Sequence, residues 1–279
     1  MQVGIATSAF DLLPPKLKGQ FTLGRQRDTV TMPAAPPAAP PSGLLLFIRY
    51  AFMPNNLGYC GGNENEVLFE HAVEGRPDPR LAPLLVKFTG AVPYLRTIAA
   101  ANGIGDPFDP RVVEAYWIGN ELLDGVEAGD LYRSLEERFG KHLPAKVRDQ
   151  VLRKPPAGAK PYHLFHVLDV YRHLEADSVG MAAMESCRIS WGQVTNVDGA
   201  SVTVDRRPLV QVDGKLALGE ARAERVLRAF EGRGFADDLA AGDWVSVHWG
   251  WICEKLDRRR LANLQTASAA ALKLANQTI

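Results

Sequence analysis

The chain has few cysteines and no excess of either charge. Of its 279 residues only three are cysteine, Cys60, Cys187 and Cys253, and they are scattered along the sequence. Three cysteines this far apart do not form a disulfide framework. They are typical of a protein in a reducing compartment, where thiols stay free to bind ligands. Lysine plus arginine equals aspartate plus glutamate at 32 each, so the formal net charge is zero. Because nucleic-acid binders and polybasic membrane anchors carry a basic excess, we expect neither kind of partner.

Long apolar runs are missing as well. The longest, Leu44 to Met53, contains Arg49 and is too short to span a bilayer. The N-terminus shows no basic segment followed by an apolar core, so we expect no secretory signal. These features predict a soluble, cytoplasmic protein.

The composition divides the chain into three parts. Residues 1–41 have little pattern and end in Pro33–Pro41, which has five prolines in nine positions and predicts a disordered tail. An initiation codon assigned too early would explain residues 1–31, since Met32 directly precedes this segment. Residues 42–184 carry apolar residues at helical spacing and predict a helical domain, in which Asp109 and Pro110 begin one helix.

Residues 185–279 predict a small β-domain that ends in a helix. Apolar residues alternate from Val194 to Val204 around the turn signal Asp198-Gly199, which is typical of a hairpin. The remaining patterns are a helical or irregular insertion over 220–230, a strand over 243–252 and an amphipathic helix over 257–276. The expected fold class is therefore α+β, with a mostly helical N-terminal domain followed by a small β-barrel and a C-terminal helix.

Two short motifs in the β-domain carry the clearest chemistry. The first is Cys187-Arg-Ile-Ser-Trp-Gly-Gln-Val, and the second is Gly242-Asp-Trp-Val-Ser-Val-His248-Trp-Gly. A thiol and an imidazole at the two ends of a compact β-domain favour metal binding. The alternative for both residues is structural, because free cysteine is among the most buried residue types and the tryptophans beside His248 suit an apolar strand.

The order of the two motifs resembles that of HypC-type hydrogenase assembly chaperones, over residues 187–270. The resemblance implies an OB-like β-barrel with a C-terminal helix. It also implies an accessory role in nickel–iron hydrogenase maturation, carrying or delivering the iron–cyanide–carbonyl fragment or docking on the large subunit. The implied partners are the hydrogenase large-subunit precursor and a maturation scaffold protein. Carried over by position, Cys187 is the iron-binding thiolate and His248 assists it.

The chain departs from that family in four respects. The family's cysteine follows the initiator methionine, whereas Cys187 is internal. Trp191 stands where the family usually has proline, the stretch between the motifs is longer, and a helical domain precedes the first motif. The resemblance therefore predicts the thiol but not the chemistry of a free N-terminal amine.

The helical domain holds a candidate second site formed by Cys60, His163, His166 and Glu114. Cys60 lies between glycines in Leu57–Asn63, and a helix would place His163 and His166 on one face as a metal-ligand pair. The alternatives are a loop whose glycines only permit a turn, a chance His-x-x-His pair, and a solvated glutamate. Whether these side chains meet is not determined by their spacing.

Two other functions stay open. The helical domain could be a metal-dependent enzyme that makes or modifies a small ligand, with the barrel as its delivery module. The barrel could instead bind single-stranded nucleic acid through Arg188, Trp191, Arg206 and Arg207. The zero net charge makes the nucleic-acid interpretation the weaker of the two.

Overall fold

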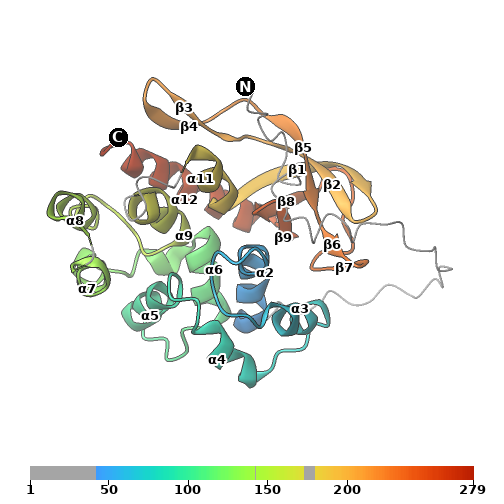
Figure 1. The fold of residues 1–279 in the computed structure, drawn as a ribbon, viewed down its shortest axis with the longest axis horizontal. Coiled ribbons are helices and arrows are strands. Elements are labelled where there is room, and N and C mark those ends of the chain that lie inside the picture. The colour runs from blue at the N-terminus through green and yellow to red at the C-terminus, as the bar shows by residue number, and fades with distance from the viewer. Residues whose placement is uncertain (1–41, 142, 173–179) are drawn as a thin grey trace.

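The protein forms a layer of helices packed against a layer of strands. The computed structural model describes residues 42–141, 143–172 and 180–279, and the tail expected over 1–41 lies outside the described residues. Figure 1 shows the helices of residues 43–152 on one side and the strands on the other. The expected α+β class is therefore confirmed.

The helical layer is built from short helices. Its helix α6 begins as expected, because the Asp109 side chain accepts a hydrogen bond from the backbone N–H of Arg111 and Pro110 follows directly. The segment η4 is a π-helix. The elements are α2 (Gly43–Asn56), α3 (Asn65–Val73), η2 (Pro79–Leu81), α4 (Ala82–Leu85), α5 (Val92–Ala101), α6 (Pro110–Ile118), η3 (Glu121–Leu123), α7 (Ala128–Phe139), α8 (Ala145–Leu152), α9 (His163–Phe165), η4 (His166–Tyr171) and α11 (Met181–Cys187).

The strand layer is a five-stranded mixed sheet with two small hairpins beside it. The sheet comprises β1 (Ser190–Asp198), β2 (Ser201–Arg206), β5 (Arg222–Leu227), β8 (Trp244–His248) and β9 (Trp251–Lys255). Strands pair in the order β1-β2-β5-β9-β8, and β8 also pairs with β1; only β5 and β9 are parallel, through one residue pair. The hairpins are β3 (Leu209–Val212) with β4 (Lys215–Leu218) and β6 (Ala229–Phe230) with β7 (Arg233–Gly234).

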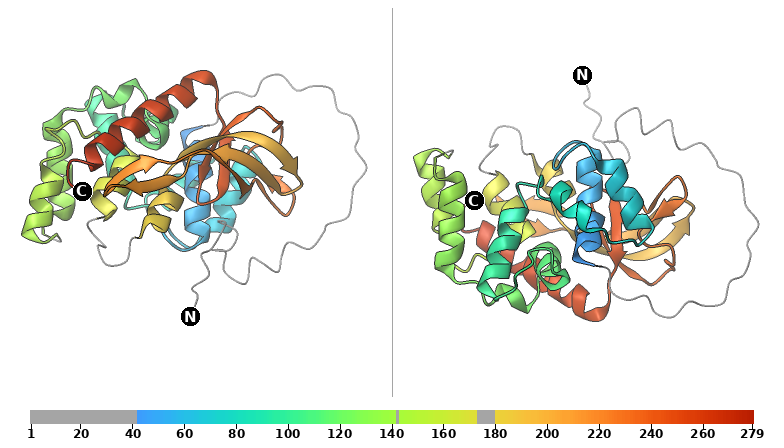
Figure 2. Two further views of the ribbon diagram at one scale, coloured as in Figure 1. Left: turned by 90° about the horizontal axis from the view of Figure 1, so that it is seen from above. Right: turned by 90° about the horizontal axis from the view of Figure 1, so that it is seen from below.

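The C-terminal helix α12 (Arg258–Ala275) confirms the amphipathic helix expected over 257–276. It contacts α6 and α9 in the helical layer as well as β1 and β4. Figure 2 shows it running along the helical layer beside the strands. The helix therefore joins the two layers along one side of the molecule.

Two of the expected elements are corrected by the pairing of strands. The hairpin around Asp198-Gly199 is confirmed as β1 and β2. Residues 220–230 are not helical or irregular but form β5 and β6, because Val226 pairs with Val202 of β2 and both are buried. Residues 243–252 form two strands rather than one, since the chain reverses at Trp249 and Gly250, whose φ angles are 52° and 68°.

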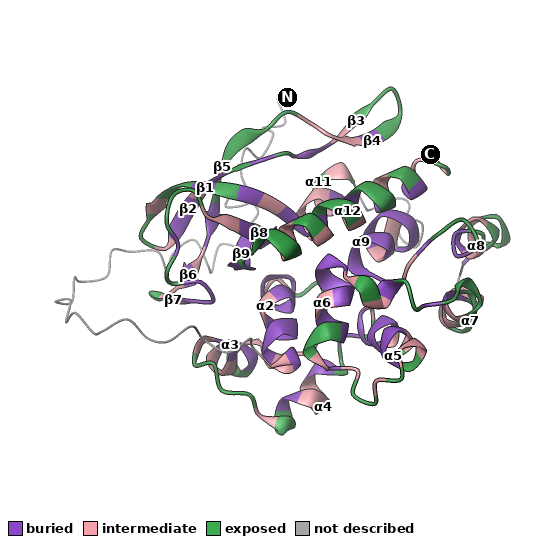
Figure 3. Ribbon diagram, turned by 180° about the vertical axis from the view of Figure 1, so that it is seen from behind, coloured by how far each residue is buried: buried purple, intermediate pink, exposed green. Residues whose placement is uncertain are grey.

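The two layers share a large apolar core, and the strand layer has a second, smaller apolar cluster that includes Val194, Val202 and Val247. Helix α2 is buried along nearly its whole length, and Figure 3 shows α2 and α6 as the most buried helices between the layers. Trp251 of β9 is fully buried, and its ring centroid lies 5.0 Å from Phe52 of α2 and 5.5 Å from Phe235. Because the apolar cluster is continuous from α2 to β9, the helices and the sheet depend on each other for stability.

We expect Trp251→Ala to lower the free energy of unfolding by about 3–5 kcal/mol, since it leaves a cavity where the layers meet. Urea unfolding followed by circular dichroism and by tryptophan fluorescence measures the change. Tyr132→Ala, at an exposed position of α7, is the control and should change the stability by less than about 0.5 kcal/mol. Separate unfolding transitions for helices and sheet would contradict the shared core.

Candidate metal centre

Three elements bring potential metal ligands together where the helices meet the sheet. His163 begins α9, Cys187 ends α11 and His248 ends β8. One ligand atom from each lies within 4.8 Å of the other two, and the Cys187 Sγ is 3.8 Å from the His163 Nε2. Cys187 and His248, which the two motifs single out, thus lie side by side, and His163 joins them from the helical layer.

Backbone contacts orient the His248 ring toward the cluster. Its Nδ1 lies 2.7 Å from the carbonyl oxygen of Tyr50, which can only accept, so Nδ1 carries the proton and Nε2 keeps its lone pair. His248 is 1% exposed, and within the described residues its Nε2 has no hydrogen-bond partner. A buried acceptor without a partner costs roughly 1–3 kcal/mol. A metal ion would satisfy this lone pair.

His163 needs a change of tautomer before it can act as a ligand through Nε2. Its Nε2 donates to the carbonyl oxygen of Cys187 over 2.8 Å, while Nδ1 faces the Tyr116 hydroxyl at 3.3 Å. Moving the proton to Nδ1 lets it donate to the Tyr116 oxygen and frees Nε2 for a metal. Tyr116 therefore serves either tautomer, because its hydroxyl can both accept and donate.

Aromatic side chains enclose the two imidazoles. The Trp117 ring centroid lies 4.8 Å from that of His163 and 5.8 Å from that of His248, and the two imidazole centroids are 5.1 Å apart. Phe47 also packs against Trp117, with the ring centroids 5.4 Å apart. Water is thereby kept from the imidazoles, which strengthens electrostatic interactions within the cluster.

Burial keeps all three groups uncharged near neutral pH. It lowers the pKa of His163 to about 4 and that of His248 well below the usual value, so both rings are neutral and can donate lone pairs. It raises the pKa of the Cys187 thiol to about 12, with the Trp249 indole acting in the opposite direction. A thiolate–imidazolium pair is therefore not the resting state, and a bound cation would supply the charge that a thiolate requires.

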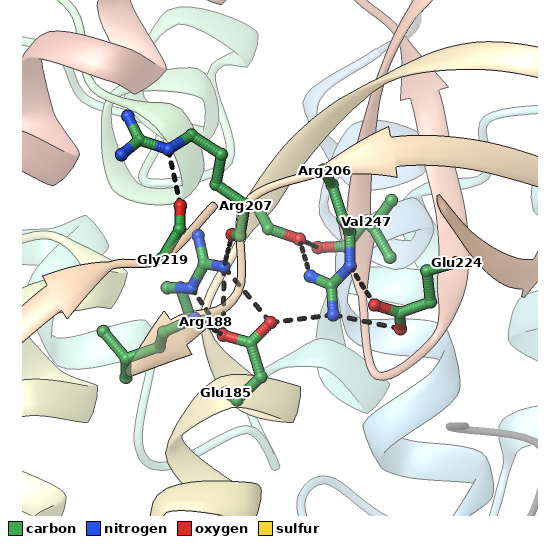
Figure 4. Close-up of polar contacts among 9 residues, drawn as sticks. Glu185, Arg188, Arg206, Arg207, Gly219, Glu224 and Val247 are labelled. Atoms are coloured by element: carbon green, nitrogen blue, oxygen red, sulfur yellow. Dashed lines mark hydrogen bonds and ion pairs between the residues drawn. The ribbon is translucent and has the colours of Figure 1, made fainter. Parts of the chain in front are cut away.

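A buried network of ion pairs fixes the segment that carries Cys187. Glu185 pairs with Arg188 at 2.9 Å and with Arg206 at 2.8 Å, and Arg206 pairs with Glu224 at 2.7 Å. Figure 4 shows Arg206 between the two glutamates. Because Arg188 is 1% and Arg206 6% exposed, neither offers the basic surface that nucleic-acid binding would require. Their role is to anchor the connection between α11 and β1.

The structure does not bring His166 and Glu114 to this cluster. The chain changes from an α-turn to a π-helix at His166, whose Nδ1 contacts the Tyr94 hydroxyl at 3.1 Å. Glu114 instead forms ion pairs with Arg259 and Arg260 of α12, at 2.7 and 3.0 Å. The candidate second site is therefore divided, with His163 at the Cys187–His248 cluster and these two residues elsewhere.

The other two cysteines lie outside the group of three. Cys253 is buried in β9, and its thiol donates to the carbonyl oxygen of Trp251 over 3.7 Å, as suits a structural residue. Cys60 is exposed on the loop after α2. The group of three potential ligands does not include Cys60.

Sequence reasoning missed the residues that surround the ligands. Tyr50 and Tyr116 orient the imidazoles and Trp117 encloses them, and neither tyrosine was singled out as part of a site. One usable signal was the adjacent aromatic pair Tyr116-Trp117 in α6. The pairing of these residues with His163 and His248 depends on packing between distant elements.

We expect zinc binding to tighten as the pH rises, because the metal must displace the Cys187 proton. With a thiol pKa of about 12, the logarithm of the association constant should rise by at least about one per pH unit between about pH 6 and 8. Competition titrations with a chromophoric chelator measure it. Cys187→Ala should lower this slope by about one, and Cys253→Ala should leave it unchanged. A pH-independent affinity of the wild type would rule out thiolate ligation.

The relationship of the chain to known proteins rests on one family match. Among the described helices, none has the length and apolar character needed to cross a membrane. No curated protein matches the chain. A family model described as a family of unknown function, DUF6390, matches residues 39–279 and so includes every residue of the cluster. The chain therefore belongs to the DUF6390 family.

Proposed function

We propose that the protein is a cytoplasmic metallochaperone, an accessory factor in nickel–iron hydrogenase maturation that carries or delivers the iron–cyanide–carbonyl fragment. The observation that carries the proposal is the convergence of Cys187 and His248. They come from two motifs that together resemble HypC-type chaperones, and their ligand atoms lie within 4.8 Å of each other. Cargo binding would use this thiolate and the neighbouring imidazoles.

The donor set suits such a cargo. Thiolate is a soft, electron-donating ligand and favours a low-spin iron that carries π-acceptor ligands, while imidazole binds iron and other transition metals. Both imidazoles are neutral at physiological pH because burial lowers their pKa values. The buried lone pair of His248 has no other partner among the described residues, which favours a ligand role over a purely structural one.

The exposure of the three residues suits transfer. Cys187 is partly exposed, whereas His163 and His248 are buried. We propose the hydrogenase large-subunit precursor and a maturation scaffold protein as the partners, which would dock where Cys187 is partly exposed. The buried imidazoles would keep the cargo positioned until one of these partners docks.

We further propose that the strand layer corresponds to the OB-like β-barrel of the HypC-type family. Two observations support this assignment. Strand β8 pairs with both β9 and β1, and α12 follows β9 as the C-terminal helix of that family would. The helices that precede α11 are an addition, and their contribution to the cluster is His163.

The test is anaerobic purification together with hydrogenase maturation partners, followed by infrared spectroscopy. We expect cyanide and carbonyl stretching bands in the wild-type preparation, and their loss in Cys187→Ala, because the thiolate holds the iron. Cys253→Ala, which alters a buried thiol outside the cluster, is the matched control and should retain the bands. Bands of unchanged intensity in Cys187→Ala would refute the assignment.

The alternative is a metal-dependent enzyme whose helical layer makes or modifies a small ligand. One observation favours it, since His163 and its enclosing Tyr116 and Trp117 come from that layer. An enzyme of this kind keeps its metal when purified without partners. We expect the carrier to lose its metal under those conditions, as elemental analysis would measure. Metal retained by the wild type but lost from His163→Ala, with His71→Ala as the control, would favour the enzyme.

A further inference from the structure

We propose that Cys60, on the loop that follows α2, is a fourth ligand of the metal bound by His163, Cys187 and His248. The inference rests on the proposed metal-binding function of that cluster and adds a second thiolate to it. The loop comprises residues 57–62 and contains three glycines. Its closure over the cluster would complete a Cys2His2 site.

Contacts on either side of Cys60 place the loop against the cluster. The Tyr59 ring stacks on that of Trp249, with centroids 4.2 Å apart, and Trp249 follows His248 in the chain. The Trp249 backbone N–H donates to the carbonyl oxygen of Ser186, which precedes Cys187, over 2.8 Å. The Cα atoms of Cys60 and Tyr59 are about 3.8 Å apart, because the two residues are consecutive. Cys60 therefore follows directly a residue that contacts Trp249, and Trp249 in turn contacts the residue before Cys187.

Asn55 holds the backbone of the loop on both sides of the thiol. Its Nδ2 donates to the carbonyl oxygens of Cys60 and Gly62, each over 2.7 Å. Gly61 has a φ of 79°, and a Cβ there would lie 2.5 Å from the Phe88 ring, so only glycine fits. Gly58, also at 79°, has open space around it. The loop is thus held on both sides of Cys60, because the Tyr59 backbone N–H also donates to the carbonyl oxygen of Pro54 over 2.9 Å.

Trp249 adopts a backbone conformation that side chains rarely take. Its φ of 52° lies in the left-handed region, where a bulky residue costs of order 1–3 kcal/mol. Asparagine or glycine is the usual choice at this position of a two-residue hairpin turn. The strained residue follows His248 directly and places its indole against the Tyr59 ring. It therefore links the Cys60 loop to the cluster.

The cluster itself calls for another ligand. Three protein donors leave a metal such as zinc or cobalt one short of tetrahedral coordination. The buried Nε2 of His248 has no partner among the described residues and belongs to the same group of ligand atoms as the Cys187 thiol. Cys60 is the exposed thiol beside this group. As the most accessible of the four, it is the ligand that a docking partner can displace first.

Anaerobic titration of the full chain with cobalt(II) tests the inference, because the sulfur-to-cobalt charge-transfer band grows with the number of thiolate ligands. We expect the band of Cys60→Ser at saturation to fall to about half that of the wild type, since one of two thiolates is lost. Cys187→Ser should cause a similar loss. Cys253→Ala should retain the full band, and its buried thiol makes it the matched control.

The outcomes separate this inference from the proposed function. A band of equal intensity in the wild type and Cys60→Ser, with loss in Cys187→Ser, would overturn the fourth ligand and leave the three-residue centre standing. No cobalt band in the wild type would overturn both. Because Cys60 is exposed, its substitution is not expected to disturb folding, and thermal unfolding of the apo-proteins checks this directly.

Discussion

The contacts of one residue, Tyr50, hold the helical layer against the sheet and set the orientation of the candidate metal centre. Its carbonyl oxygen accepts from His248 Nδ1 at 2.7 Å, and its hydroxyl bonds with Ser246 Oγ at 3.1 Å and with the Glu254 carboxylate. These partners lie on both strands of the β8–β9 hairpin. Because Tyr50 belongs to the buried helix α2, any shift of the helix relative to the hairpin would break all three contacts. The direction of the His248 lone pair follows from this arrangement.

The charged groups around the centre form ion pairs with groups of opposite charge, whereas the residues of the centre itself are neutral. Glu254 is buried against Arg260 of α12 at 2.6 Å, and the Glu185–Arg206–Glu224 network is closed within the protein. Buried charges of this kind persist only when they are paired. The Cys187 thiol has no such partner, and burial raises its pKa to about 12. A cation at the cluster would therefore bind two neutral imidazoles and a thiol, and the thiol would lose its proton to give a negatively charged thiolate.

The sequence correctly predicted those helices and strands that are determined by residues close to one another in the chain. Asp109 and Pro110 begin α6 because a cap and a fixed φ act within one helical turn. The β1–β2 hairpin follows from alternation around Asp198-Gly199. Residues 220–230 could not be assigned in the same way, because β5 acquires its strand geometry from pairing with β2 rather than from its own charged sequence. The sequence did not reveal that the chain reverses at Trp249, because this bulky residue stands where a hairpin turn usually has asparagine or glycine.

The sequence by itself determined the α+β class, and it singled out Cys187 and His248 because motif order is written in the chain. Only the tertiary structure decided that His163 joins them while His166 and Glu114 do not. Helical spacing fixes which residues share a face, but it does not fix which face meets a distant strand. That choice depends on the burial of α2 and α6 against the β8–β9 hairpin, which brings together residues separated by more than half of the described chain.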